Sequence, residues 1–128
     1  MIRKPVFSSK APKPKGIYSP GIVAQGRFLF VSGQIPVDPV TQEMQLGDIK
    51  QQTERTFGNI GLLLDEAGSS WDHVVKVNVY LADMADFSAM NDIYKQFFKE
   101  PYPARTTIGA ALPIKGMLIE IDCIALVP

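Results

Sequence analysis

The sequence predicts an α+β fold, a two-layer sandwich in which two helices cover one face of a mixed sheet in the order β-β-α-β-α-β-β. Two segments carry apolar residues at three- and four-residue spacing, which is typical of amphipathic helices. The remaining segments alternate in polarity or are rich in β-branched residues, which is typical of strands. The chain has 128 residues and 46% of them are hydrophobic, so we expect residues 1–128 to form a single domain.

The first predicted elements are an extended arm and a hairpin. Residues 10–20 are rich in Pro, Lys and Gly, which favours an extended arm over a helix. Two apolar segments, residues 22–24 and 27–31, flank Gln25-Gly26. This arrangement predicts a tight β-hairpin whose second strand ends at Ser32-Gly33-Gln34.

The first predicted helix spans residues 48–67. Asp48 is placed to cap its start and Gln51 to complete a capping box, while Gly68 favours termination. One face carries Ile49, Thr53, Phe57, Ile60, Leu64 and Ala67.

A strand is predicted next, over residues 74–81, because this segment is dense in β-branched residues. This strand and residues 117–127 are largely apolar on both alternating faces. An antiparallel sheet with one solvated face alternates more cleanly. We therefore expect the sheet face away from the helices to be covered, and the expected cover is another copy of the chain.

The second predicted helix follows two candidate capping residues, Asp83 and Asp86, and ends before Pro101. Its apolar face carries Phe87, Met90, Tyr94 and Phe97. Together with the first helix it forms the expected helical layer.

The last two strands are predicted as a hairpin. Residues 105–111 and 117–127 are extended segments joined by a short loop at 112–116. Reflection about the middle of that loop places Arg105 near Cys123, with a register that is open by a few residues.

Candidate chemistry lies on these two strands. Glu120 and Asp122 are two residues apart on one strand face, and Arg105 and Thr107 share one face of the other strand. A guanidinium held between apolar walls binds a planar anion such as a carboxylate, and a nearby glutamate can orient a water molecule. A purely structural Arg-Glu pair is the alternative interpretation, and residue chemistry alone leaves both open.

Composition excludes several function classes. The 13 basic and 13 acidic side chains cancel, which argues against a nucleic-acid or anionic-membrane partner, although residues 1–37 are basic. No apolar run has the length of a signal peptide core or a membrane span. A single cysteine agrees with a reducing compartment, so we expect a cytoplasmic protein.

No metal or cofactor site is expected. The only histidine, His73, and the only cysteine, Cys123, are far apart in the sequence and form no metal-ligand set. Cys123 lies opposite the carboxylate face, among apolar residues, which predicts a buried and inert thiol. No nucleophile triad or phosphate-binding loop has the required spacing.

The sequence resembles the Rid (YjgF-type) family over nearly its whole length. The motifs that carry the resemblance are Gly16-Ile17-Tyr18-Ser19-Pro20, Phe30-Val31-Ser32-Gly33-Gln34-Ile35-Pro36, Asn91-Asp92-Ile93-Tyr94 with Phe97-Phe98, Pro103-Ala104-Arg105-Thr106 and Ile119-Glu120-Ile121-Asp122.

The resemblance implies a chorismate-mutase-like fold, assembled as a homotrimer around a central barrel with a ligand cleft at each subunit boundary. It implies that Arg105 binds the substrate carboxylate and that Glu120 positions the attacking water. It further implies that Tyr18, Ser32 and Gly33 shape the cleft.

The implied activity is that of a deaminase. Such an enzyme hydrolyses reactive 2-imino acids, such as 2-iminopropanoate and 2-iminobutanoate, to 2-oxo acids and ammonia. These imines are released by pyridoxal-dependent dehydratases acting on serine or threonine, so the implied role is control of metabolite damage. The hydrolysis itself needs no cofactor.

Two residues depart from the family pattern. Thr107, in the implied substrate pocket, stands where many members carry Cys, and Ile17 replaces a common Pro. We expect activity to survive without a cleft thiol, with an altered substrate preference or an altered sensitivity to thiol oxidants. Asn91 is expected to be a structural hydrogen-bonding residue.

Three other functions remain open. An endoribonuclease or translation inhibitor is also a role found in the resembled family, and the basic segment before Arg27 supports it. A non-catalytic regulatory protein could bind 2-oxo acids through the same Arg105 cleft. A pathway-specific deaminase for an aminoacrylate or aminomuconate would need a differently shaped pocket.

Overall fold

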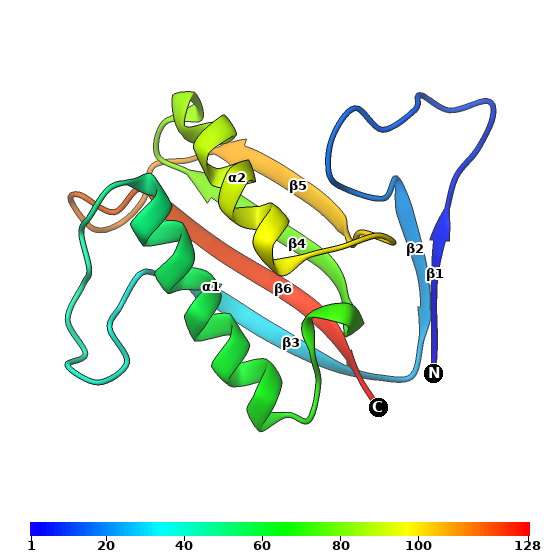
Figure 1. The fold of residues 1–128 in the computed structure, drawn as a ribbon, viewed down its shortest axis with the longest axis horizontal. Coiled ribbons are helices and arrows are strands. Elements are labelled where there is room, and N and C mark those ends of the chain that lie inside the picture. The colour runs from blue at the N-terminus through cyan, green and yellow to red at the C-terminus, as the bar shows by residue number, and fades with distance from the viewer.

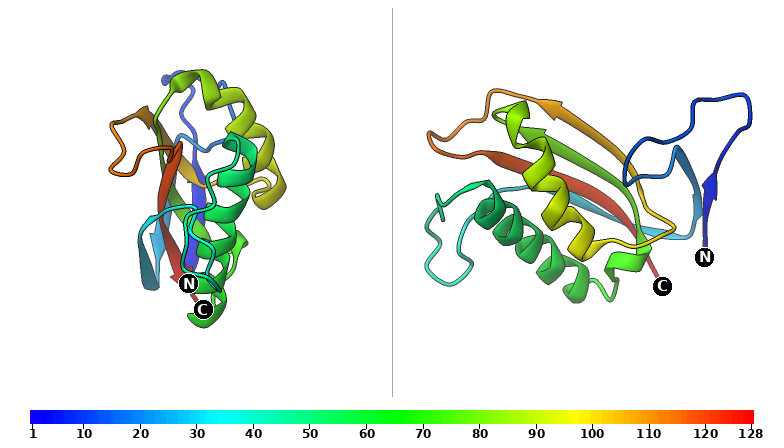
Figure 2. Two further views of the ribbon diagram at one scale, coloured as in Figure 1. Left: turned by 90° about the vertical axis from the view of Figure 1, so that its left-hand side faces the viewer. Right: turned by 45° about the horizontal axis from the view of Figure 1, so that its top comes forward.

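Two helices lie side by side across one face of a four-stranded sheet in the computed structural model, which describes residues 1–128 (Figure 1). Viewed along its edge, the molecule has two layers, and no helix lies on the other face of the sheet (Figure 2). The helices are α1 (Ile49–Glu66) and α2 (Phe87–Phe97). The strands are β1 (Ile2–Val6), β2 (Gly21–Gln25), β3 (Arg27–Gln34), β4 (Val74–Leu81), β5 (Ala104–Gly109) and β6 (Ile119–Val127). The predicted α+β sandwich is confirmed.

The longer helix, α1, starts and stops at the predicted residues. The Asp48 carboxylate accepts from the Gln51 N–H, and the Gln51 side chain accepts from the Asp48 N–H, each at 2.8 Å. At the other end Gly68 has φ +74°, a left-handed conformation that costs glycine little. Both capping predictions are confirmed.

The shorter helix, α2, is entered through a 3₁₀ turn, Met84–Asp86. The Asp83 carboxylate accepts from the Ala85 N–H at 2.9 Å and so caps this turn, whereas Asp86 makes no side-chain cap bond. The predicted helix is confirmed, but only Asp83 of its two candidate caps makes a side-chain capping bond.

The predicted hairpin of the last two strands is wrong. The strand order is β3-β6-β4-β5, so β4 lies between β5 and β6. Strand β5 runs parallel to β4 because α2 carries the chain back along the sheet before β5 begins. Strand β6 pairs antiparallel with both β3 and β4. The sequence of two extended segments joined by a short loop does not show whether the two strands pair with each other or with a third strand between them.

The predicted hairpin around Gln25-Gly26 is wrong as well. Strand β2 pairs with β1 in a separate two-stranded sheet, and β3 pairs with β6. Gly26, with φ +142°, redirects the chain from one sheet to the other. The sequence pattern did not predict β1, which contains a proline, and β1 provides the partner for β2. The arm at residues 10–20 contains no helix or strand, as expected.

The core fills the space between the helices and the sheet. Its buried side chains include Phe57, Ile60, Leu64, Val77, Val79, Met90, Tyr94, Ile119, Ile121 and Cys123. The opposite face of the sheet leaves large apolar side chains in solvent, since Phe30 is 71% and Phe28 42% exposed. No helix combines the length and apolar character needed to cross a membrane.

Candidate functional site

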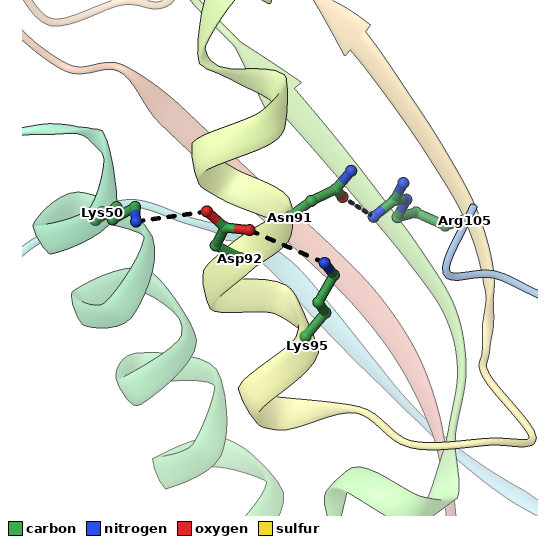
Figure 3. Close-up of polar contacts among 5 residues, drawn as sticks. All are labelled: Lys50, Asn91, Asp92, Lys95 and Arg105. Atoms are coloured by element: carbon green, nitrogen blue, oxygen red, sulfur yellow. Dashed lines mark hydrogen bonds and ion pairs between the residues drawn. The ribbon is translucent and has the colours of Figure 1, made fainter. Parts of the chain in front are cut away.

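Arg105 lies on β5, the edge strand next to α2, and points toward the helical layer. Its Nη1 donates to Asn91 Oδ1 at 2.7 Å (Figure 3). The guanidinium lies over the Tyr94 ring at 4.7 Å and the Phe87 ring at 5.5 Å from the centroids. No carboxylate pairs with it. A fixed cation with spare donors is thus held between two aromatic walls, which suits a planar anion.

Burial determines the electrostatics of Arg105. Desolvation lowers the pKa of the guanidinium from its ordinary value, and the phenols of Tyr94 and Tyr18 act in the opposite direction. An arginine keeps its proton even so, because a guanidinium gives it up only far above neutral pH. A bound carboxylate would compensate this charge in a place where water does so incompletely.

Tyr18 is held close to the start of β5 by its neighbour in the chain. The buried Ser19 donates its N–H to the Pro103 carbonyl at 3.1 Å and its hydroxyl to the Tyr102 carbonyl. These bonds attach the arm to the residues just before β5. Tyr18 also lines a cavity of about 480 Å³ between the arm and this segment.

Thr107 shares the helix-side face of β5 with Arg105, as predicted, because both pair with buried β4 residues, Val79 and Val77. Its Oγ1 is buried and has no hydrogen-bond partner. We refer to Arg105, Asn91, Tyr18 and Thr107 as the arginine half-site.

Glu120 lies on the uncovered face of β6, with Gly33 of β3 beside it. A Cβ added at Gly33 would collide with Glu120 Oε2, so the carboxylate lies directly over the glycine backbone. Ser32 is exposed at the same irregularity in β3, where the pairing register shifts between Val31 and Gln34. A cavity of about 430 Å³ adjoins Gly33 on the α1 side, where Asn59 and Leu63 also line it, and Glu120 is not part of its lining. We refer to Glu120, Gly33 and Ser32 as the glutamate half-site.

The two half-sites do not meet within one chain. Arg105 lies on β5 and Glu120 on β6, two strand spacings or about 10 Å apart, while Gly33 and Ser32 lie on β3, the opposite edge of the sheet. Arg105 points to the helices and Glu120 to the uncovered face. Cys123, the expected neighbour of Arg105, is the cross-strand partner of Val77 on β4, and Arg105 is the partner of Val77 on the other side. Strand β4 therefore separates Cys123 from Arg105. The predicted closeness of Arg105 to the carboxylates failed because it rested on the hairpin.

Sequence reasoning treated Asn91 as structural and missed the aromatic walls. Phe87, Asn91 and Tyr94 lie four and three residues apart, so they share one helix face. A lone amide within an apolar stripe was the available signal. The neighbouring Asp92 faces the other way, where it pairs with Lys50 of α1 at 3.4 Å and Lys95 at 3.9 Å (Figure 3).

The two other candidate residues, His73 and Cys123, make local or core contacts. His73 Nδ1 lies 3.0 Å from the Ser70 hydroxyl, a local contact at the start of a 3₁₀ turn. No group of three or more His, Cys, Asp or Glu side chains is positioned to hold a metal ion. Cys123 is buried, as predicted, and burial raises the pKa of its thiol to about 12.

Thiol reagents are expected neither to label nor to inhibit the native protein. At pH 8 the Cys123 thiol is protonated and shielded, and the reactive species is the thiolate. Labelling should become rapid only when denaturant unfolds the chain, which mass spectrometry at increasing urea concentration would follow. Stoichiometric labelling of the folded protein would contradict this result.

Replacing Thr107 by valine is expected to raise the free energy of unfolding by about 1 kcal/mol, because it removes a buried hydroxyl that has no partner. Thr53 provides a matched control, since its buried hydroxyl donates to the Ile49 carbonyl at 2.7 Å. Thr53→Val should destabilise. Urea unfolding of both variants measures the difference, and a destabilised Thr107→Val protein would show that the hydroxyl has a native partner.

Comparison with known proteins identifies the family. The family model described as Endoribonuclease L-PSP, which is the Rid/YjgF family, matches residues 8–127. The chain belongs to the Rid family. A RutC family protein of Pyrococcus abyssi is 49% identical over 125 residues, which cover 98% of each chain. The 2-iminobutanoate/2-iminopropanoate deaminase of Bos taurus is 38% identical, over 98% of this chain and 90% of its own.

Solved Rid structures share the fold. RidA from an Antarctic Psychrobacter is 38% identical, with a TM-score of 0.74 and coverage of 98% of this chain and 100% of its own. In the present Rid protein the family motifs divide between the half-sites. The Pro103-to-Thr106 motif begins β5, and the Ser32-Gly33-Gln34 motif ends β3.

Proposed function

We propose that this Rid protein is a deaminase that hydrolyses reactive 2-imino acids to 2-oxo acids and ammonia. The observation that supports this proposal most directly is the half-buried Arg105 guanidinium, which neutral Asn91 positions and no carboxylate neutralises. The proposed substrates, 2-iminopropanoate and 2-iminobutanoate, carry a planar carboxylate that fits the guanidinium fork. The name of the Bos taurus relative supports the same reaction.

In the proposed mechanism Arg105 binds the substrate carboxylate and presents C2 of the imine. Water held by Glu120 adds to C2, and Glu120 accepts the proton and returns it to nitrogen. The resulting tetrahedral carbinolamine expels ammonia and leaves a 2-oxo acid. One water is consumed for each ammonia released, and no electron acceptor is needed.

A complete site requires two copies of the chain. Because Arg105 and Glu120 lie on opposite faces of the sheet with β4 between their strands, we propose that each site joins one chain's Arg105 to a neighbour's Glu120. The uncovered face with exposed Phe28 and Phe30 supports such an assembly. We propose the homotrimer with clefts between subunits that the family resemblance implies.

Mixing inactive variants tests both proposals. Arg105→Ala and Glu120→Gln chains would be assayed separately and as co-assembled protein, by ammonia and 2-oxo acid release in a threonine dehydratase reaction. If each site joins two chains, an equal mixture regains about a quarter of the native sites. A mixture that stays inactive would place both residues of each site in one chain. A wild-type protein that adds nothing to the uncatalysed rate would refute the deaminase and leave 2-oxo acid binding to be titrated.

RNA cleavage is the second candidate. The description of the family model and the exposed Lys10, Lys13 and Lys15 of the arm favour it, while the balanced charge of the chain weighs against it. Incubating RNA with wild type and Arg105→Ala separates the two functions. Cleavage that persists in Arg105→Ala would support a ribonuclease site outside the arginine half-site.

A further inference from the structure

A hydrogen-bonded cluster lies on the uncovered face of β4 and β6, next to Glu120. Asn78 Nδ2 donates to Asp122 Oδ1 at 2.7 Å, and the Tyr80 phenol donates to Asp122 Oδ2 at 2.9 Å. Both oxygens of Asp122 are therefore occupied by neutral donors from the neighbouring strand. None of these three residues belongs to either half-site.

The strand register makes the direction of the Tyr80 bond informative. Tyr80 is the cross-strand partner of Glu120, and Asn78 is the partner of Asp122. The phenol nevertheless donates diagonally to Asp122 instead of to the carboxylate opposite it. A phenol has a single proton to donate, so this bond keeps it away from Glu120.

Glu120 has no hydrogen-bond donor within its own chain. Lys76, a cation of β4 on the same sheet face, donates to the Thr106 hydroxyl at 2.8 Å. Glu120 is flanked by Gly33 on one side, where a Cβ would collide with it, and by Tyr80 on the other. Its position is thus restricted while its oxygens stay free to accept from water.

We infer that Tyr80, held by Asp122, is a positioning residue for Glu120. Its ring forms the wall opposite Gly33, and Asp122 binds the phenol proton that would otherwise occupy the Glu120 carboxylate. This inference rests on the proposed function, because it assigns a role to Glu120 as the residue that binds the attacking water. The raised pKa of Tyr80, caused chiefly by the Asp122 bond, agrees with a phenol that stays protonated.

A double-mutant cycle distinguishes this role from a structural one. Asp122→Ala frees the phenol to donate to Glu120, and kcat should fall about tenfold while KM changes little, because Arg105 still binds the substrate. Adding Tyr80→Phe to Asp122→Ala removes the competing proton and should restore kcat to within about threefold of wild type. If the cluster only holds β4 and β6 together, the kcat of the double variant should be no higher than that of Asp122→Ala.

Two controls accompany the cycle. Thr106→Val removes a polar contact from the same sheet face and should leave kcat unchanged. If Asp122→Ala does not fold, Asp122→Asn weakens the phenol bond by removing the charge and replaces it in the cycle. An unchanged kcat in the Asp122 variant, or a double variant whose kcat is not restored, overturns the inference. The proposed function stands in either case as long as the wild-type protein hydrolyses the imine. A wild-type protein without imine hydrolysis overturns both.

Discussion

Arg105→Ala is expected to lower kcat/KM for 2-imino acids by about 100- to 1,000-fold, the loss typical of a bidentate, charge-assisted contact in a partly desolvated site. Most of the loss should appear in KM, because the guanidinium binds the carboxylate before the imine reacts. The coupled dehydratase assay measures both constants. A variant that keeps wild-type kcat/KM would remove Arg105 from the mechanism.

The fold should survive this substitution. Burial disfavours the Arg105 charge, as its lowered pKa shows, so removing the charge relieves a desolvation cost. Arg105→Lys keeps the charge but loses the planar fork, and kcat/KM should remain about tenfold below wild type. Arg27 is the matched control, because its exposed guanidinium bonds only to the Pro128 carbonyl, at 3.4 Å. Arg27→Ala should keep full activity.

Gly33→Ala is expected to lower kcat by about 10- to 100-fold, because misplacing a catalytic group by about 1 Å has effects of this size. The added Cβ would collide with Glu120 Oε2 and lie 3.0 Å from its Cδ. The carboxylate is the far end of a flexible side chain, so we expect it to move while the strands stay paired. Steady-state kinetics and circular dichroism would measure kcat and fold together.

A second strand glycine controls for the general cost of adding a methyl group. A Cβ at Gly21 in β2 would lie 3.8 Å from Val6 Cβ, an ordinary van der Waals contact. Gly21→Ala should therefore leave kcat at the wild-type value. If Gly33→Ala is equally active, the glycine is not what keeps the Glu120 carboxylate in place.

The sequence by itself determined the elements whose signals are local. The bounds of α1 follow from the Asp48–Gln51 capping box and Gly68, because capping bonds join residues only a few positions apart. Strand β4 was predicted at its exact bounds, since a density of β-branched residues is a property of consecutive residues. The shared face of Arg105 and Thr107 follows from the two-residue alternation of side chains along a strand.

Only the tertiary structure decided which strands pair and where the half-sites lie. Strand order depends on contacts between distant segments, and periodicity carries no information about partners. Inserting β4 between β5 and β6 separated Arg105 from the carboxylates. The Tyr80–Asp122 bond became visible only with the β4–β6 register. Alternation shows that a strand has two faces, but packing against α2 decides which of them faces the helices.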